Sequence, residues 1–359
     1  MTHSWRASLH RRASGRTVLT VGIVLLVVSF VTASARGAYA ISPWQLMSVV
    51  WDLLSGSAIG PGQVQTSPEH LVFLNIRLPR LLLGVAAGAA LGLSGALMQG
   101  LFRNPLADPG LIGVSSGAAL AAGITIVMGS MWFPELPRTL GSWTLVLMAF
   151  MGSLVVTFLV YWLSQQDGST RVGLMLLAGI AINALAGAGL GFLTFLASDE
   201  QLRSIQFWLL GSLGGARWSA VALVSGIVLT AVCAGIMLAR PLNAIALGEA
   251  QAALLGVPVE RVKRLAVLVT ALAVGAVTAT TGMIGFVGLV APHGVRLVAG
   301  PDHRVVLPGS ALLGAALVLL ADSVARTAVK PAELPLGVLT AFVGVPFFLL
   351  LLRHFKGRL

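Results

Sequence analysis

Long apolar runs recur along the whole of this chain, and they limit its possible folds more than any other feature. A helix rises about 1.5 Å per residue, so roughly 20 apolar residues cross the hydrocarbon core of a bilayer. About ten such runs can be marked, and each predicts a membrane-spanning helix. They cover residues 17–34, 78–100, 110–129, 142–163, 172–197, 218–238, 265–281, 284–300, 305–325 and 336–352.

Composition supports a single membrane domain. Of the 359 residues, 57% are hydrophobic and 10% are charged, whereas about 25% are charged in an ordinary soluble domain. No hydrophilic stretch is long enough to form a second, soluble domain. The single cysteine, Cys233, lies inside an apolar run, so the chain offers neither a disulfide framework nor a thiolate metal site. The predicted fold class is all-α, a polytopic membrane bundle of about ten transmembrane helices.

The basic residues predict the topology. Residues 1–16 form a basic arm ahead of the transmembrane domain, residues 17–359. The start also resembles a signal peptide with Ala33-Ser34-Ala35 at the cleavage position, but we expect this segment to remain as the first span. An even number of spans puts both termini on one side, and a cytoplasmic assignment leaves most of the 23 lysines and arginines inside. The net charge of +11 then reflects topology and attraction to anionic lipid, and does not predict nucleic-acid binding.

Glycine spacing in the second span predicts close helix packing. Gly84, Gly88, Gly92 and Gly95 fall at intervals of four, four and three residues, which places them on one helical face. Lipid supplies no hydrophobic drive between helices, so membrane helices associate through small residues of this kind. The stripe predicts a compact bundle and no particular function.

Charged residues inside spans are costly and are usually retained for a reason. The acids lie between the predicted spans or at their ends, except Asp322, which lies within the ninth span near its outer end. Arg326 follows four residues later, so an ion pair on one helix face is the simplest interpretation. A proton-relay role for Asp322 is the alternative.

Two arginines flank Pro79 at the outward start of the second span. Arg77 and Arg80 are unfavourably placed there, because cations at a helix amino terminus oppose the helix dipole. An external acidic partner would account for them. Their side chains reaching to lipid headgroups would account for them equally well.

The longest inner loop, residues 240–264, predicts two short helices. Residues 243–247 and 249–255 are separated by Gly248, and Gly256 with Pro258 closes the second. Such helices are suited to lie in the membrane interface or to dock a cytoplasmic motor. The residues alone do not separate these two interpretations.

Several long motifs together resemble one family, the permeases of iron-siderophore and cobalamin ABC importers (type II). The resemblance runs from about residue 77 to the carboxyl end. The motifs are Arg77-Leu-Pro-Arg80, Leu91-Gly-Leu-Ser-Gly-Ala-Leu-Met-Gln99, Arg103-Asn-Pro-Leu-Ala-Asp-Pro-Gly-Leu-Ile-Gly-Val114, Leu247-Gly-Glu-Ala-Gln-Ala-Ala-Leu-Leu-Gly256, Gly285-Phe-Val-Gly-Leu-Val-Ala-Pro-His293 and Glu333-Leu-Pro-Leu-Gly-Val-Leu-Thr340.

The resemblance implies an architecture and a set of partners. It implies a ten-span subunit that dimerises around a central path, with spans 2–5 and 7–10 related as inverted halves. The implied partners are a dimer of ATP-binding subunits, an extracytoplasmic substrate-binding protein and a second permease subunit, identical or related. The implied location is the inner (cytoplasmic) membrane, in contact with lipid, with both termini cytoplasmic.

The resemblance also assigns roles to residues of this sequence. Docking of the binding protein falls to Arg77, Arg80 and Arg326. Coupling to the ATPase falls to Gly248, Glu249, Leu255 and Gly256. Asn104 and Leu106 match a cytoplasmic gate, whereas Val172-Gly173 stands where small hydroxyl residues of a further constriction would fall. Asn183 in the fifth span either lines the path or makes an interhelical hydrogen bond.

No motif for covalent catalysis or nucleotide binding is present in the sequence. The six histidines are scattered, and neither a His-Glu-x-x-His pattern nor a phosphate-binding loop occurs. We therefore expect no enzyme, no cofactor or metal held by this chain, and ATP used by a partner subunit. His293, after Pro292, is interpreted as structural.

The predicted function is the translocation of a metal chelate by alternating access, driven by ATP hydrolysis on the partner. The resemblance favours a ferric siderophore as cargo, with haem and cobalamin open. An ion-coupled secondary transporter is the alternative, but it needs a midplane ion site, and only Asp322 offers a carboxylate within a span. A membrane enzyme is a third class, disfavoured because no nucleophile, base and metal converge.

Overall fold

The fold was analysed in a computed structural model of the chain. It describes residues 13–37, 44–45, 47–48, 51, 68–132, 135–329 and 332–356. Of the predicted basic arm, residues 1–12 lie outside the described residues. The described part is almost entirely helical, and its one sheet is a two-stranded hairpin of β1 (Gln165–Gln166) and β2 (Ser169–Thr170).

Each of the ten predicted spans corresponds to an apolar helix. Seven helical segments in the described residues are long and apolar enough to cross a membrane, and three more are apolar but shorter. The ten helices are α1 (Gly15–Ala35), α4 (Leu78–Leu101), α5 (Val114–Trp132), α7 (Trp143–Leu163), α8 (Val172–Leu196), α10 (Trp218–Met237), α13 (Val259–Thr281), α14 (Val287–Ala299), α15 (His303–Ala325) and α16 (Leu336–Lys356). The fold class predicted from the sequence is confirmed.

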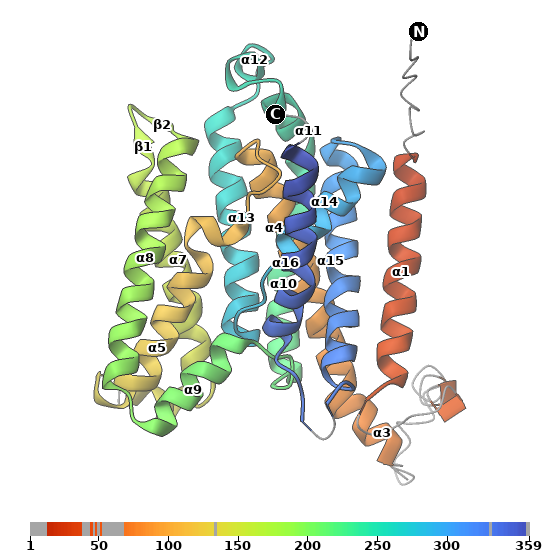
Figure 1. The fold of residues 1–359 in the computed structure, drawn as a ribbon, viewed down its shortest axis with the longest axis vertical. Coiled ribbons are helices and arrows are strands. Elements are labelled where there is room, and N and C mark those ends of the chain that lie inside the picture. Colours follow the sequence, from red (N-terminus) through yellow and green to blue (C-terminus); the bar gives the residue numbers. More distant parts are fainter. Residues whose placement is uncertain are drawn as a thin grey trace.

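Short helices mark the two ends of the bundle (Figure 1). At one end, here called the α12 end, lie α11 (Ala239–Ala246) and α12 (Glu249–Leu254). At the other, the α9 end, lie α9 (Asp199–Leu210), α6 (Glu135–Leu140) and α3 (Pro68–Val72), which a π-turn, η2 (Phe73–Arg77), joins to α4. Helix α1 begins and α16 ends at the α12 end.

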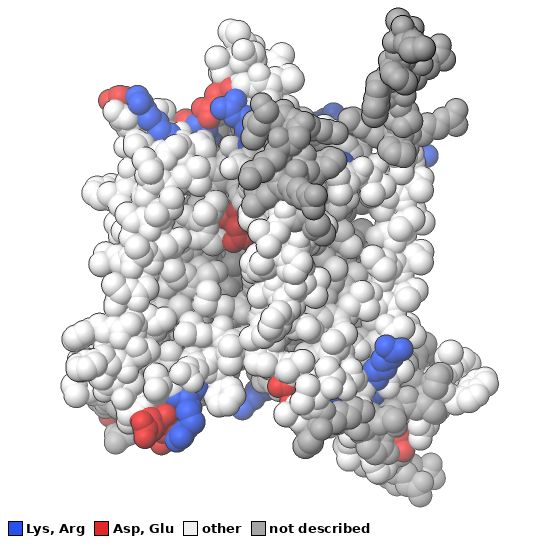
Figure 2. All heavy atoms as spheres, viewed as in Figure 1, with Lys and Arg blue, Asp and Glu red and all other residues white. Residues whose placement is uncertain are grey.

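Charge follows the same division. Figure 2 shows lysine, arginine, aspartate and glutamate side chains gathered at the two ends, with an almost uncharged belt between them. Many leucine, valine and phenylalanine side chains of α1, α7, α8 and α10 are exposed in this belt. An exposed apolar belt between two charged rims is stable in lipid and would aggregate in water.

Two helices are interrupted where the sequence predicted continuous spans. Residues 110–112 of the third predicted span belong to a 3₁₀ turn, η3 (Pro109–Ile112), and α5 begins only at Val114. Residues 284–286 of the eighth are not helical, because Phe286 adopts a positive φ of 64° and α14 starts after it. The remaining 13 residues of α14 measure about 20 Å, which is less than the bilayer core. The predicted starts of both spans are therefore wrong.

Helix α4 lies at the centre of the bundle, and the glycine stripe explains how closely its neighbours approach. A methyl group at Gly88 or Gly92 would overlap backbone carbonyl oxygens of α15, those of Gly314 and Ser310. At Gly95 it would overlap the carbonyl oxygen of Gly288 in α14. The predicted packing role is confirmed, and the contacts are backbone to backbone.

Substituting a central glycine should therefore weaken the bundle. We expect Gly92→Ala to destabilise the protein by about 1–3 kcal/mol, because a rigid carbonyl leaves no room for the new methyl group. The melting temperature in detergent measures this. Gly226→Ala in α10 is the matched control, because nothing lies within 4 Å of that position. Equal melting temperatures for both variants would contradict the packing role.

Candidate functional site

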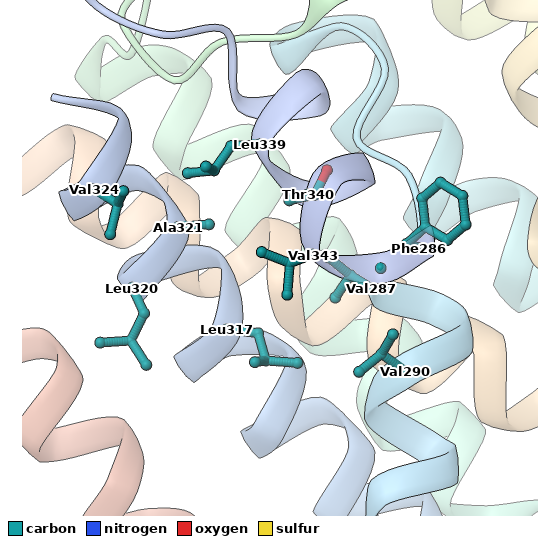
Figure 3. Close-up of a pocket in the computed structure, with 11 residues that line it drawn as sticks. Phe286, Val287, Val290, Leu317, Leu320, Ala321, Val324, Leu339, Thr340 and Val343 are labelled. Carbon is teal, nitrogen blue, oxygen red and sulfur yellow. The ribbon is translucent and has the colours of Figure 1, made fainter. Parts of the chain in front are cut away.

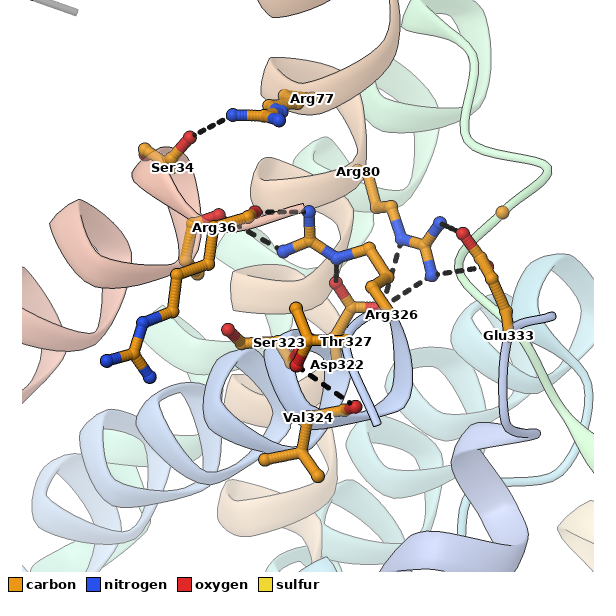
Figure 4. A network of polar contacts seen from close by, with 12 residues as sticks. Ser34, Arg36, Arg77, Arg80, Asp322, Ser323, Val324, Arg326, Thr327 and Glu333 are labelled. Atoms are coloured by element: carbon orange, nitrogen blue, oxygen red, sulfur yellow. Dashed lines mark hydrogen bonds and ion pairs between the residues drawn. The ribbon is translucent and has the colours of Figure 1, made fainter. Parts of the chain in front are cut away.

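At the α9 end, buried arginines and carboxylates from three segments form one cluster, here called the arginine cluster (Figure 4). Arg80 donates from Nε to Oδ1 of Asp322 at 3.0 Å. Its two terminal nitrogens donate to the carboxylate of Glu333 at 3.0 and 2.9 Å. Arg326 pairs with Oδ2 of Asp322 at 2.9 Å. The predicted Asp322–Arg326 pair is confirmed, but Asp322 also holds Arg80, a contact that crosses 242 residues of sequence.

The carboxyl end of α1 completes the arginine cluster. Arg77 donates to the carbonyl oxygen of Ser34 at 2.7 Å, and Arg326 donates to those of Ala33 and Arg36, both at 3.1 Å. Cations are favoured at a helix carboxyl terminus. Of the two arginines that oppose the dipole of α4, Arg77 thus complements the dipole of α1, together with Arg326, whereas Arg80 is held by carboxylates (Figure 4). Ala33 and Ser34, within the sequence resembling a cleavage site, are buried in this contact.

All three predicted docking arginines are buried. Arg77, Arg80 and Arg326 are 4%, 8% and 7% exposed, so in this conformation their side chains do not reach out to lipid headgroups. The carboxylate side chain of Glu333 is 46% exposed and covers Arg80 from the outside. Docking of a binding protein at these arginines stays a prediction. The structure shows in addition that the carboxylate of Glu333 already binds Arg80.

The α12 end carries the two predicted short helices. Helix α11 begins at Ala239, four residues before its predicted start, and α12 ends at Leu254. Gly248 joins them with a φ of 126°, and Gly256 follows α12 with a φ of 80°. Side chains strain the backbone at such angles, which explains glycine at both positions.

Three exposed leucines lie at the α12 end of the molecule. Leu247, Leu254 and Leu255 are 69%, 89% and 67% exposed. Leu254 belongs to α12 and the other two lie beside it, and α12 projects from this end of the bundle (Figure 1). An apolar patch at a charged rim marks an interaction surface. The sequence pointed to Leu255 and missed the other two.

Beneath the leucines, one lysine ties three elements together in what is here called the Lys263 cluster. Lys263 of α13 is 1% exposed, and its Nζ donates to Glu249 at 2.7 Å, to Glu260 at 3.1 Å and to the carbonyl oxygen of Thr170 at 2.7 Å. Glu260 in turn accepts from the backbone nitrogen and hydroxyl of Thr170. Helix α12, helix α13 and the β1–β2 hairpin are therefore joined. The sequence showed Lys263 only as one inner cation, because its partners lie in separate segments.

The two helix interruptions meet inside the bundle. Gly288, just after the second interruption, lies close to Pro109 and Asp108 in the first. Asp108 accepts a hydrogen bond from the backbone nitrogen of Gly110 at 2.8 Å, which caps η3. Asn183 of α8 donates to the carbonyl oxygen of Gly110 at 3.1 Å and accepts from Ser116. For Asn183, the structure thus shows the interhelical hydrogen bond that the sequence left as one of two interpretations.

Cavities adjoin this meeting point. One of about 290 Å³ is lined by Leu106, Asp108, Gly285, Phe286, Leu289 and Phe348. A second of about 170 Å³ also has Asp108 in its wall. Asn104 is exposed and accepts a hydrogen bond from the backbone nitrogen of Leu106 at 2.9 Å, so it shapes the turn that carries Leu106. The gate role of both residues stays a prediction. Sequence reasoning missed Asp108, whose position before Pro109 indicates only a helix cap.

A further pocket, of about 240 Å³, lies between α14, α15 and α16 (Figure 3). Its lining is apolar apart from Thr340, and Val343, Leu317 and Val287 converge on it. His293 on α14 is buried and packs edge-on against Phe347, with ring centroids 6.0 Å apart. Within the described residues, no group of three histidine, cysteine or acidic side chains is placed to hold a metal ion.

The geometry is that of a membrane bundle with internal cavities beside two irregular segments, and the comparisons with known proteins define its class. The chain belongs to the FecCD transport family, whose model matches residues 25–354. It is 44% identical over 351 residues to the hemin transport system permease protein HmuU of Yersinia pestis, covering 98% of this chain and 99% of that protein.

Two further relatives agree. The chain is 40% identical over 345 residues to the cobalamin import system permease protein BtuC of Halobacterium salinarum, covering 96% of this chain and 90% of that protein. A solved inward-facing structure of a transporter assigned to the metal-chelate type of ABC transporters matches with a TM-score of 0.81 at 30% identity, covering 94% and 99% of the two chains. The protein is thus the permease subunit of an ABC importer and an integral protein of the inner membrane.

Breaking the arginine cluster should cost stability. We expect Arg80→Met and Asp322→Asn each to destabilise the protein by at most about 3–5 kcal/mol, because each removes one member of a buried charge network whose other members keep only part of their pairing. Thermal unfolding of the two single variants and the double variant measures the coupling. The double variant should cost less than the sum of the single ones. Arg217→Met, at an exposed arginine of the same end, is the control, and strictly additive losses at Arg80 and Asp322 would contradict the pairing.

Proposed function

We propose that this permease imports a metal chelate handed over by a binding protein at the α9 end, and that ATP hydrolysis on subunits docked at the α12 end drives the transfer. The exposed leucines in and beside α12 carry the proposal, because such a patch projecting from a charged rim is typical of a surface that docks a partner. In this arrangement the α12 end is cytoplasmic, and both termini lie there.

The Lys263 cluster supports the mechanical part of the proposal. A displacement of α12 moves Glu249, and the buried ion pair with Lys263 transfers that displacement to α13. Through Thr170 it also reaches the hairpin between α7 and α8. Alternating access needs such a link between nucleotide state and helix position. Gly248 and Gly256 give α12 its orientation, and Leu255 belongs to the docking patch.

The docking patch can be tested directly. Replacing Leu254 and Leu255 together by aspartate should weaken association with the ATP-binding subunit at least about 30-fold, as expected for apolar anchors at the centre of an interface. Co-purification and titration of the subunit onto the permease in nanodiscs measure this. Leu140→Asp places the same charge on an exposed leucine at the opposite end. Equal weakening by both changes, or by neither, would contradict the assignment.

Docking of the binding protein is proposed at the arginine cluster. The partly exposed carboxylate of Glu333 forms an ion pair with the guanidinium of Arg80. An acidic side chain of the incoming protein would therefore compete with Glu333 for Arg80. Arg77 and Arg326 add positive charge next to Arg80. Because Glu333 leads directly into α16, its release is a means of connecting docking to a span.

Removing the competing carboxylate should strengthen docking. We expect Glu333→Gln to tighten binding of the cognate binding protein about fivefold, since Arg80 loses the exposed one of its two carboxylate partners. Surface plasmon resonance on the reconstituted complex measures the dissociation constant. Glu200→Gln removes an exposed acid on α9 at the same end and should leave it unchanged. Weaker docking of the Glu333 variant would overturn the competition.

For the cargo, we propose an iron chelate with haem as the first to be tested, because the relative that matches over nearly the full length of both proteins is a hemin permease. The two other candidate cargoes to be tested are a ferric siderophore, which is also an iron chelate, and cobalamin, which contains cobalt. The permease, reconstituted with its ATP-binding subunits, its binding protein and the second permease subunit that the family implies, should accumulate one of the three only with ATP. Uphill uptake by the permease alone on an ion gradient would instead support a secondary transporter.

A further inference from the structure

A groove between α7 and α13 shares no lining residue with the cavities beside Asp108, with the exposed leucines around α12 or with the arginine cluster. Its volume is about 560 Å³. The apolar part of its lining comes from both helices and consists of Leu154, Phe158, Val267, Leu268, Ala271 and Leu272. Three polar residues, Thr157, Tyr161 and Arg264, complete the lining.

The polar residues are ordered along the groove. Helix α7 ends and α13 begins toward the α12 end, so Tyr161 and Arg264 lie at the mouth of the groove on that side. Thr157 lies one helical turn deeper, about 6 Å along α7. The apolar lining continues to Leu272, about 12 Å along α13 from Arg264. From the surface inward, the groove thus has a charged mouth at Arg264, a polar position at Thr157 (the polar step) and an apolar inner part (the apolar floor).

The charge at the mouth, Arg264, forms no direct ion pair, and the carboxylate of Glu260 acts on it only from beyond ion-pair distance. Arg264 is exposed and its guanidinium lies beside the Tyr161 hydroxyl. No carboxylate in the described part of the chain forms an ion pair with it by distance, in contrast to the neighbouring Lys263. Arg171 and Arg261 are also exposed toward the α12 end, so the surroundings are basic.

The polar step is also unpaired. Thr157 is 2% exposed, and its hydroxyl has no hydrogen-bond partner among the described residues. On α13, the hydroxyls of Thr280 and Thr281 bond to carbonyl oxygens of the preceding turn. The hydroxyl of Thr270 is also without a partner among the described residues, but Thr270 does not line the groove. A buried hydroxyl left without a partner costs free energy, so an acceptor supplied from outside the chain would stabilise it.

We propose that the groove binds one anionic phospholipid of the leaflet at the α12 end, with the phosphate at Arg264, an ester carbonyl at Thr157 and an acyl chain along the apolar floor. Basic pockets between transmembrane helices hold anionic headgroups in this way. The order and spacing of the three kinds of lining match those of a phospholipid. A zwitterionic lipid fits less well, because Glu260, the carboxylate that acts on Arg264, is already bound to Lys263, and Arg171 and Arg261 make the surroundings basic.

The site lies next to the coupling machinery. The Tyr161 hydroxyl accepts a hydrogen bond from Thr170 at 3.3 Å, and Thr170 bonds both Glu260 and Lys263. A phospholipid at Arg264 and Tyr161 is therefore one residue removed from the Lys263 cluster. Its binding would brace the hairpin against α13.

Native mass spectrometry of the delipidated full chain, titrated with phosphatidylglycerol or phosphatidylcholine of identical acyl chains, tests the proposal. We expect one phosphatidylglycerol to bind at least about fivefold more tightly than phosphatidylcholine, the effect of about one cation near a headgroup. Arg264→Gln should abolish this preference. Arg261→Gln, an exposed arginine one turn away and outside the groove lining, should preserve it.

Two further arms identify the ligand and the site. Thr157→Val should weaken binding of both lipids about equally, because both carry the ester carbonyl. Inorganic phosphate should not displace the lipid, because the acyl chain supplies part of the affinity. Equal losses in the Arg264 and Arg261 variants would mean unspecific surface charge and overturn the site. Displacement by phosphate would overturn the lipid as its occupant.

Discussion

The bilayer offers no hydrogen bond to a free backbone group, and this constraint underlies the interior of the protein. A continuous helix satisfies its own backbone, but the interruptions before α5 and α14 do not. The structure meets the need by bringing them together inside the bundle, where Asp108 caps η3 and Asn183 binds the carbonyl oxygen of Gly110. Because irregular backbone at this depth is tolerated only within protein or beside a cavity, the cavities next to Phe286 and Asp108 are part of the same solution.

The same limitation of lipid as a solvent explains how α4 holds the bundle together. With no hydrophobic drive between helices, close packing must supply the cohesion, and glycines at 88, 92 and 95 allow backbone contact with α15 and α14.

Both ends of the bundle use buried charge, with different consequences. At the α9 end, Asp322 holds Arg80 and Arg326, and α1 supplies carbonyl oxygens from its carboxyl end, so the cations are held by partners within the chain. Only Glu333 in this cluster is open to exchange with an external acid. At the α12 end, Lys263 fixes the position of α12 relative to α13 and the β1–β2 hairpin. One end thus offers a replaceable partner and the other a fixed link, as expected for docking and for transmission of force. A phospholipid against Tyr161 would add the membrane to that link.

The sequence by itself determined the class of fold, the ten apolar helices, the glycine face of α4, the pair of short helices at Gly248 and the Asp322–Arg326 pair. These depend on local period, length and spacing, which a single segment displays. Only the tertiary structure decided the interruptions at η3 and before α14, the partners of Arg80 and Lys263, and the place of Asp108. Each arises from contacts between segments far apart in the chain, and apolar composition cannot show where a helix breaks when the rest of the protein satisfies the exposed backbone. For the same reason, the sequence could not show that Arg77 and Arg326 bind the carboxyl end of α1. A sequence shows how a charged residue is placed relative to the dipole of its own helix, but not which other helix end its side chain contacts.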